Sequence, residues 1–164
     1  MNPYNLSKLG ILLLESNFLM RRLLVDVFNS FGVASVQSTA DPEVAFDLFK
    51  AVPVDIVMSD WSPDLDGLAF LRRLRTDPDS PNPFVPVIIC SAKSKFRDVC
   101  KARDTGMTEY LTKPVSANHI YSRIVSLIEH DRHFIRVGNF FGPDRRRHLG
   151  DSPEGKDRRR ASNA

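Results

Sequence analysis

The feature that most constrains the fold is a regular alternation of short apolar segments with amphipathic helical segments along most of the chain. Apolar runs of this length predict strands that are buried on both faces of a sheet. Each run is followed by apolar residues at three- and four-residue steps, the spacing of an amphipathic helix. The five predicted strands are Gly10 to Leu14, Val33 to Ser38, Val54 to Ser59, Pro86 to Ser91 and Glu109 to Thr112.

Local signals mark where the predicted helices begin and end. Gly32 follows the first helix and Gly106 the fourth, and glycine readily adopts the left-handed conformation that ends a helix. Asp41 and Pro42 supply a cap and a first helical residue for the second helix. Five strands that alternate with five helices require right-handed crossovers. The sequence therefore predicts one doubly wound α/β domain with a five-stranded parallel sheet.

Composition and length exclude several classes of protein. The 164 residues, 42% of them apolar, suffice for one globular domain and leave little room for a second. No apolar run approaches the roughly 20 residues of a membrane span, and we expect no signal peptide, so a cytosolic (cytoplasmic) protein is predicted. Cys90 and Cys100 are too few for a disulfide framework and lack a zinc-ligand spacing. Both are predicted to be buried or half-buried apolar residues.

Charge divides the chain into two parts. Residues 1–131 carry 14 Lys and Arg against 16 Asp and Glu, a net charge of −2, whereas residues 132–164 carry 9 against 4, a net charge of +5. Apolar periodicity almost vanishes after Phe141, and glycine and proline recur there. The sequence thus predicts a body over residues 8–131 and a basic, flexible tail over residues 132–164 that is largely disordered without a ligand.

Polar residues stand at the carboxyl ends of four predicted strands, which meet at one edge of a parallel sheet. They are Glu15 and Ser16 after the first strand, Asp60 after the third, Ser91 at the end of the fourth and Lys113 after the fifth. This set suits acceptance of a phosphoryl group: Asp60 would attack, Lys113 would pair with the phosphoryl oxygens, and Ser91 would hydrogen-bond one of them. Because carboxylate and phosphoryl oxygens repel each other, the acidic side is predicted to hold Mg²⁺. The alternative is that Asp60 and Lys113 form only a structural ion pair.

With these residues in place, positions 8 to about 131 resemble the CheY-like receiver domain of two-component response regulators. The resemblance implies a strand order of 2-1-3-4-5 and a cis peptide bond before Pro114. It rests on a set of residues that spans the whole body of the chain. The matching residues are Glu15 after its apolar strand, Asp60 with Pro63–Gly67 after it, Ser91-Ala92, Tyr110 and Lys113-Pro114.

The resemblance also implies a mode of signalling. Asp60 would be the phosphoacceptor, with a sensor histidine kinase or a histidine phosphotransfer protein as the phosphodonor. Phosphorylation would draw Ser91 inward and let Tyr110, the switch aromatic, follow. Output to a downstream protein would then pass through the face built by the fourth helix, the fifth strand and the fifth helix.

Two departures from the family pattern affect the predicted Mg²⁺ site. Ser16 stands where receivers usually carry a second acid that ligates the cation. The segment Asp60-Trp61-Ser62-Pro63 is one residue shorter than the usual one. The predicted metal ligands are therefore Glu15, Asp60 and Ser62. An alternative is a pseudo-receiver that is held in one state without phosphorylation.

The tail contains a short repeat, Gly-x-Asp-Arg-Arg-Arg, whose copies begin at Gly142 and, thirteen residues later, at Gly155. Arginine forks bind phosphates and the Hoogsteen edge of guanine, and an aspartate can accept from the N–H groups on guanine's opposite edge. Two such units match a ligand with two guanines and two phosphates, which is cyclic di-GMP, and Phe140 or Phe141 would stack on its bases. The predicted ligand-binding residues are Asp144, Arg145, Arg146, Arg147, Asp157, Arg158, Arg159 and Arg160.

The combination of body and tail resembles CheY-like cyclic di-GMP effectors, in which an arginine-rich tail binds the dinucleotide and the receiver docks on the flagellar motor switch. The leading interpretation is a signalling adaptor that is not an enzyme, since 33 residues after position 131 leave no room for a DNA-binding or catalytic output domain. One alternative is a structural receiver whose basic tail binds nucleic acid or an anionic surface nonspecifically. Another is a phosphorelay intermediate for which the tail is dispensable.

Overall fold

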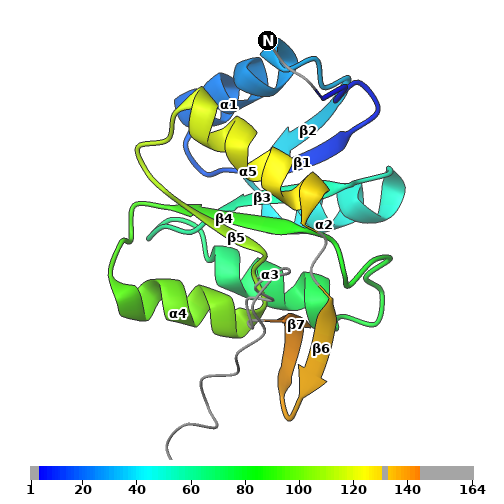
Figure 1. Cartoon of the computed structure of the whole chain (residues 1–164), viewed down its shortest axis with the longest axis vertical. Helices are drawn as coiled ribbons and strands as arrows, with labels where there is room; N and C mark the ends of the chain where they lie inside the picture. The colour runs from blue at the N-terminus through cyan, green and yellow to red at the C-terminus, as the bar shows by residue number, and fades with distance from the viewer. Residues whose placement is uncertain (1–3, 131–132, 145–164) are drawn as a thin grey trace, which may run out of the picture.

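The computed structural model describes residues 4–130 and 133–144. Five strands pair in parallel into one sheet of order β2-β1-β3-β4-β5 (Figure 1), which confirms the predicted topology. The predicted cis peptide bond between Lys113 and Pro114 is also present. The strands of the sheet are β1 Gly10–Leu14, β2 Ser35–Thr39, β3 Ile56–Asp60, β4 Val87–Ser91 and β5 Glu109–Thr112.

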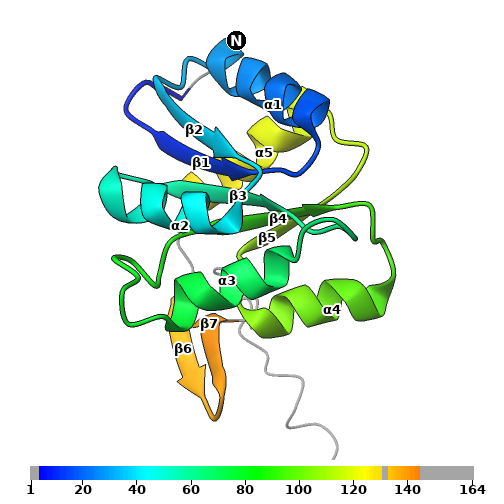
Figure 2. The same cartoon turned by 180° about the vertical axis from the view of Figure 1, so that it is seen from behind.

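Helices cover both faces of the sheet (Figures 1 and 2): α1 and α5 lie on one face, and α2, α3 and α4 on the other. Side chains of a buried strand point alternately to the two faces. In β1, Ile11 and Leu13 join the apolar cluster with α1 and α5, whereas Leu12 and Leu14 join the cluster with α2 and α3. The helices are α1 Phe18–Ser30, α2 Pro42–Ala51, α3 Gly67–Thr76, α4 Phe96–Thr105 and α5 Ala117–Glu129.

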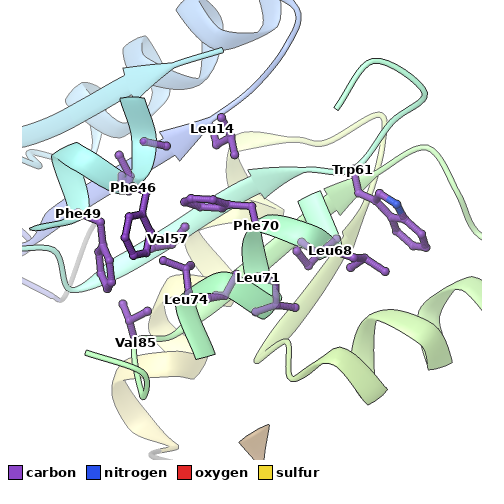
Figure 3. Close-up of a cluster of buried hydrophobic side chains, with 14 of the residues drawn as sticks. Leu14, Phe46, Phe49, Val57, Trp61, Leu68, Phe70, Leu71, Leu74 and Val85 are labelled. Carbon is purple, nitrogen blue, oxygen red and sulfur yellow. The ribbon is translucent and has the colours of Figure 1, made fainter. Parts of the chain in front are cut away.

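One of the two core clusters fixes α2 and α3 against the sheet (Figure 3). Its aromatic members include Phe46 and Phe49 of α2 and Phe70 of α3, each at most 3% exposed. Leu71 and Leu74 of α3 are fully buried beside them. Burial of each such side chain contributes about 2 kcal/mol, so packing holds α3 firmly at the end of β3.

Gly67 lets α3 begin directly against the end of β3. A Cβ atom at this position would lie 2.0 Å from the carbonyl oxygen of Asp60, so no other residue fits without displacing the backbone. The connecting loop is closed by two backbone hydrogen bonds between Ser62 and Leu65, and the Asp66 carboxylate caps the helix. The sequence at the start of α3 therefore fixes the position of the Asp60 backbone.

Helix boundaries follow the predicted signals with one exception. The Asp41 side chain caps α2, and Gly106 ends α4 in a left-handed conformation with φ of +109°. The helical pattern of the sequence begins at Ser94, whereas α4 begins two residues later at Phe96. Lys95, the residue before it, has an extended backbone and makes no capping hydrogen bond with its side chain.

The largest difference from the sequence-based expectation lies between residues 133 and 144. This segment, predicted as the start of a disordered tail, forms an antiparallel hairpin of β6 Phe134–Val137 and β7 Phe140–Pro143, joined by a two-residue turn. The rings of Phe134 and Phe141 pack edge-on or tilted against each other and against Phe84. Aromatic packing therefore orders the hairpin against the body. The remainder of the predicted tail, residues 145–164, lies outside the described residues.

Two further predictions concern membrane spans and cysteines. In the described ranges, no helix combines the length and the apolar character that crossing a bilayer requires. Cys90 is buried in β4 and Cys100 is partly exposed on α4, and both are free thiols. Burial raises the pKa of the Cys90 thiol to about 12, so it acts as an apolar core residue.

Candidate functional site

The carboxyl edge of the sheet brings four predicted side chains together. Glu15 follows β1, Asp60 ends β3, Ser91 ends β4 and Lys113 follows β5. Glu15 and Asp60 are each 1% exposed, and Ser91 is fully buried. The crossover topology thus places two buried carboxylates and one ammonium at a single edge, as predicted.

Lys113 bridges the two carboxylates. Its Nζ atom lies 2.8 Å from Asp60 Oδ1 and 2.9 Å from Glu15 Oε2. Burial lowers the pKa of Lys113, but its hydrogen bonds to Asp60 and Glu15 outweigh this effect, and the net pKa lies above the ordinary value. Lys113 is therefore a cation that compensates two buried acids at neutral pH.

The second oxygen of Asp60 accepts two hydroxyl hydrogen bonds. The Oγ atoms of Ser16 and Ser62 lie 2.7 Å and 2.9 Å from Asp60 Oδ2. Burial raises the pKa of Asp60, but the hydrogen bonds from Lys113 and Ser16 prevail, and the pKa lies below its ordinary value. The carboxylate is thus ionised at neutral pH, as a nucleophile toward phosphorus must be.

The predicted metal ligands Glu15, Asp60 and Ser62 lie close together, and their oxygens are engaged in hydrogen bonds within the protein. All four carboxylate oxygens already accept hydrogen bonds, since the remaining one, Glu15 Oε1, accepts from the backbone of Asn17. The carbonyl oxygen of Ser62 accepts from Leu65. Within residues 4–130 and 133–144, no group of three or more acidic, His or Cys side chains is placed to hold a metal. A hard cation would have to displace several of these bonds.

The predicted switch residues meet at the loop after β4. Ser91 Oγ donates to the carbonyl of Trp61 and accepts from the backbone N–H of Lys93 at 3.1 Å. The Tyr110 hydroxyl donates to the carbonyl of Lys93, and its half-buried ring packs against the core. Burial raises the pKa of Tyr110. The hydroxyl and the aromatic ring are thus connected through a single loop residue.

Sequence reasoning missed three groups that shape this edge. Ser16 was predicted as a lost metal ligand, whereas its hydroxyl is a donor to Asp60. Arg21 of α1 donates to the carbonyl of Glu15 at 2.8 Å and so holds the chain where β1 ends. Trp61 is only 6% exposed, and the Lys93 ammonium lies 4.6 Å from its ring centroid. Arg21 gave a usable signal because it lies one helical turn after the cap residue Asn17.

A protein-family model described as the response regulator receiver domain matches residues 11–125. The chain belongs to the response regulator receiver domain family. Its receiver domain is 25% identical to chemotaxis protein CheY-3 of Vibrio cholerae, over 73% of this chain and 91% of the relative. It is 24% identical to chemotaxis protein CheY of Pseudomonas aeruginosa, over 73% of this chain and 95% of the relative.

Solved structures of receivers share the fold. Vibrio cholerae CheY4 superimposes with a TM-score of 0.65 at 18% identity, over 71% of this chain and 96% of that one. HP1043, an orphan response regulator of H. pylori, gives a TM-score of 0.62 at 21% identity, over 74% of this chain and 98% of that one. The family match ends before the β6–β7 hairpin, so this element is an addition to the receiver domain.

The predicted output face of the receiver is formed by α4, β5 and α5. An ion pair between Arg123 of α5 and Glu109 of β5, with 3.4 Å between the charged atoms, crosses this face. Phe96, at the start of α4, is 80% exposed. Tyr110 of β5 connects this face to the loop after β4 through the carbonyl of Lys93.

Of the eight predicted ligand-binding Asp and Arg residues of the tail, the structure describes only Asp144. The backbone N–H of Asp144 donates to the carbonyl of His133 at 2.7 Å and so closes the open end of the hairpin. The first copy of the repeat therefore begins where the hairpin ends. The other seven predicted ligand-binding residues lie outside the described ranges: Arg145, Arg146, Arg147, Asp157, Arg158, Arg159 and Arg160.

Proposed function

We propose that this response regulator receiver accepts a phosphoryl group on Asp60 and signals by protein contact. The observation that carries the proposal is the bridge of Lys113 between Glu15 and a buried, ionised Asp60. A carboxylate oxygen of Asp60 forms a bond to phosphorus while the bond from phosphorus to a donor histidine nitrogen breaks. Lys113 balances the charge that arrives with the phosphoryl group.

The serine hydroxyls fit the same step. Ser16 and Ser62 now donate to Asp60 Oδ2, and rotation of each hydroxyl turns its proton toward an incoming phosphoryl oxygen. Ser91 would move its hydroxyl from the Trp61 carbonyl to the phosphoryl group. Because Ser91 also holds the backbone of Lys93, this movement would release the carbonyl partner of Tyr110 and shift the output face.

An apolar patch beside the acceptor fits a phosphodonor protein. Phe18, Leu19 and Leu23 of α1 are 62%, 76% and 55% exposed. Leu19 and Leu23 line a hollow of about 420 Å³ together with Lys113. A sensor histidine kinase or histidine phosphotransfer protein that packs on this patch would present its histidine to Asp60.

The first test is phosphorylation of the full chain by a small phosphodonor, with and without Mg²⁺. We expect labelling of the wild type and none of Asp60→Asn. Asp64→Asn is the matched control, because it removes an exposed carboxylate four residues away. Labelling that persists in Asp60→Asn would show that another residue is the acceptor.

One observation favours a second candidate, a pseudo-receiver held in a single state. Both oxygens of Asp60 are already bonded, and the Tyr110 hydroxyl is already bonded to the loop after β4. A wild-type chain that takes up no label at any Mg²⁺ concentration would favour this candidate.

We further propose that the duplicated arginine repeat binds cyclic di-GMP and that the receiver acts in chemotaxis, with the flagellar motor switch as a partner. The chemotaxis names of two relatives support the second part. Calorimetric titration of cyclic di-GMP into the full chain tests the first part. We expect the wild type to bind cyclic di-GMP tightly and cyclic di-AMP more weakly. A variant with all six repeat arginines changed to Ala should bind cyclic di-GMP more weakly than the wild type. Equal binding of generic polyanions with a steep salt dependence would instead indicate a nonspecific basic tail.

A further inference from the structure

A positively charged groove lies between α3, α4 and the hairpin. Figures 1 and 2 show these three elements side by side at the end of the molecule far from α1. The groove has a volume of about 600 Å³, and it is lined by one carboxylate, Asp104, and by four cations, Arg72, Arg75, Arg97 and Lys101. Residues 1–131 as a whole carry a net charge of −2. Positive charge is thus concentrated at this groove on a body that is acidic overall, so the groove attracts an anion.

The cations of the groove lack acidic partners. In the part of the chain that the structure describes, none of the four forms an ion pair with a carboxylate. Arg75 is only 3% exposed, and its Nη2 atom is buried without a hydrogen-bond partner. Its other donors reach three backbone carbonyls, those of Pro83, Val85 and Gly106. A carboxylate in the groove would supply the counter-charge that the protein itself does not give to this buried cation.

The charges are spread along the groove and do not converge on one point. Phe96 and Thr105, the first and last residues of α4, both line it, and a helix of ten residues rises by about 14 Å between its ends. Arg97 and Lys101 stand one helical turn apart on α4, and the other two cations come from α3. A single phosphate would contact only part of this length, whereas about four residues of extended chain would span it. The spacing therefore fits an acidic peptide segment.

The groove also offers an apolar contact and an amide. Phe96 lines one end of it and is 80% exposed, so the ring is available to an apolar side chain of a ligand. Asn139 of the hairpin turn lines it too, and its side-chain amide has both a donor and acceptor lone pairs for a peptide backbone. A segment with an apolar residue among its carboxylates would use both groups.

This groove is an addition to the common receiver fold. The family match ends at residue 125, whereas Asn139 and Phe141, which line the groove, belong to the later hairpin. The groove lies on the side of α4 that adjoins α3, whereas β5 and α5 complete the predicted output face. It is therefore a surface separate from that face.

We propose that this groove docks an acidic segment of a partner protein. The carboxylates of the segment pair with Arg72, Arg97 and Lys101. One of them also supplies the counter-charge of Arg75, and an apolar side chain of the segment packs on Phe96. Docking here needs neither phosphorylation nor cyclic di-GMP, so it is independent of the proposed function. A partner that contacts the output face would gain a second contact on the other side of α4.

The experiment is an NMR titration of the isotope-labelled full chain with a short probe peptide of glutamates around a central phenylalanine. A control peptide has glutamine in place of every glutamate. The proteins are the wild type, the groove variant Arg72→Glu/Arg97→Glu and the charge-matched control Lys8→Glu/Arg22→Glu. Every substituted side chain is exposed, so both variants keep the fold, which their amide spectra also check. Amide shifts are read residue by residue, so binding in the groove is distinguished from binding to arginines elsewhere in the chain.

We expect the acidic peptide to shift the amides of Phe96, Lys101 and Asn139 in the wild type and in the charge-matched control. The groove variant should bind it at least tenfold more weakly, and the glutamine peptide should leave these amides unmoved. Equal affinities of the two variants, equal binding of the glutamine peptide, or a wild type whose groove amides do not shift would each overturn the proposal. A short single-stranded oligonucleotide that shifts the same amides at lower concentration than the acidic peptide would also overturn it and assign the groove to a phosphate-bearing ligand.

Discussion

At the scale of single residues, Lys113 determines the charge balance of the functional edge. It is one cation between two carboxylates that are each 1% exposed. Neither acid has another cationic partner within the described residues. Lys113 halves the negative charge of the two carboxylates, so the edge keeps a net negative charge. A bound cation or a proton would reduce that charge further.

The pKa of Asp60 predicts how the stability of the protein depends on pH. In the folded chain the pKa of Asp60 lies below its ordinary value of 3.8, which applies to the unfolded chain. The ionised carboxylate therefore stabilises the fold at pH values above 3.8. This contribution is lost as the pH falls through the folded-state pKa. Between about pH 5 and pH 3, the free energy of unfolding should fall less in Asp60→Asn than in the wild type. Urea unfolding at several pH values measures this free energy. If the control Asp64→Asn showed the same pH dependence as Asp60→Asn, the effect could not be assigned to the lowered pKa of Asp60.

Ser16→Asp tests whether the missing second acid weakens Mg²⁺ binding at this edge. The substitution replaces a hydroxyl donor with a carboxylate beside Asp60, so it adds a metal ligand and like-charge repulsion together. Mg²⁺ affinity should rise at least tenfold, and without the cation the variant should be less stable by about 1 kcal/mol. Trp61 emission, followed during a Mg²⁺ titration, reports the binding. An affinity equal to that of the wild type would show that Ser16 is not what weakens the site.

At the scale of secondary structure, the hairpin depends on a small aromatic cluster. The Phe134 ring lies 5.3 Å from Phe84 and 5.6 Å from Phe141 between centroids, and the Arg75 guanidinium lies 4.9 Å from its centroid. Phe134→Ala should lower the free energy of local opening of the hairpin by about 1–2 kcal/mol while the five-stranded sheet stays intact. Hydrogen exchange of the amides in β6 and β7 should accelerate relative to Val137→Ala, which truncates a 66% exposed side chain. Unchanged exchange would mean that the backbone alone orders the hairpin.

The sequence predicted the strands and helices of the receiver domain better than the β6–β7 hairpin that follows them. Buried strands and capped helices have strong local signals, so the edge with Asp60 and Lys113 followed from the alternation of strands and helices. The hairpin also had a signal, a Gly-Asn pair at residues 138 and 139 between two apolar stretches, but charge and composition dominated the interpretation of the tail. Arg75 occupies the buried stripe of α3 seven residues after Leu68. The position of Arg75 in this stripe was a signal of burial that the sequence interpretation did not use, whereas its carbonyl partners are distant in sequence and could not be predicted.

At the scale of the whole molecule, α4 connects three regions. It lines a hollow of about 600 Å³ together with α3 and the hairpin, belongs to the predicted output face and follows the loop that holds Ser91 and Tyr110. Phosphorylation of Asp60 should therefore change the affinity for the proposed motor-switch partner several-fold, and the partner should change the phosphorylation equilibrium by the same factor. Calorimetry on chains with and without a stable phosphoryl analogue measures the first effect. Identical affinities would show that the two sites act independently.

The ion pairs of Lys113 with Glu15 and Asp60 also affect the order in which the sheet edge forms during synthesis. During synthesis both acids, Glu15 and Asp60, leave the ribosome well before residue 113. A nascent chain that has reached β4 therefore holds two carboxylates at one edge without their cation, and closing that edge would bring like charges together. Completion of the edge must wait for the last strand of the sheet. Lys113, which the proposed phosphoryl transfer needs, is thus also the residue whose arrival balances the charge of the sheet edge.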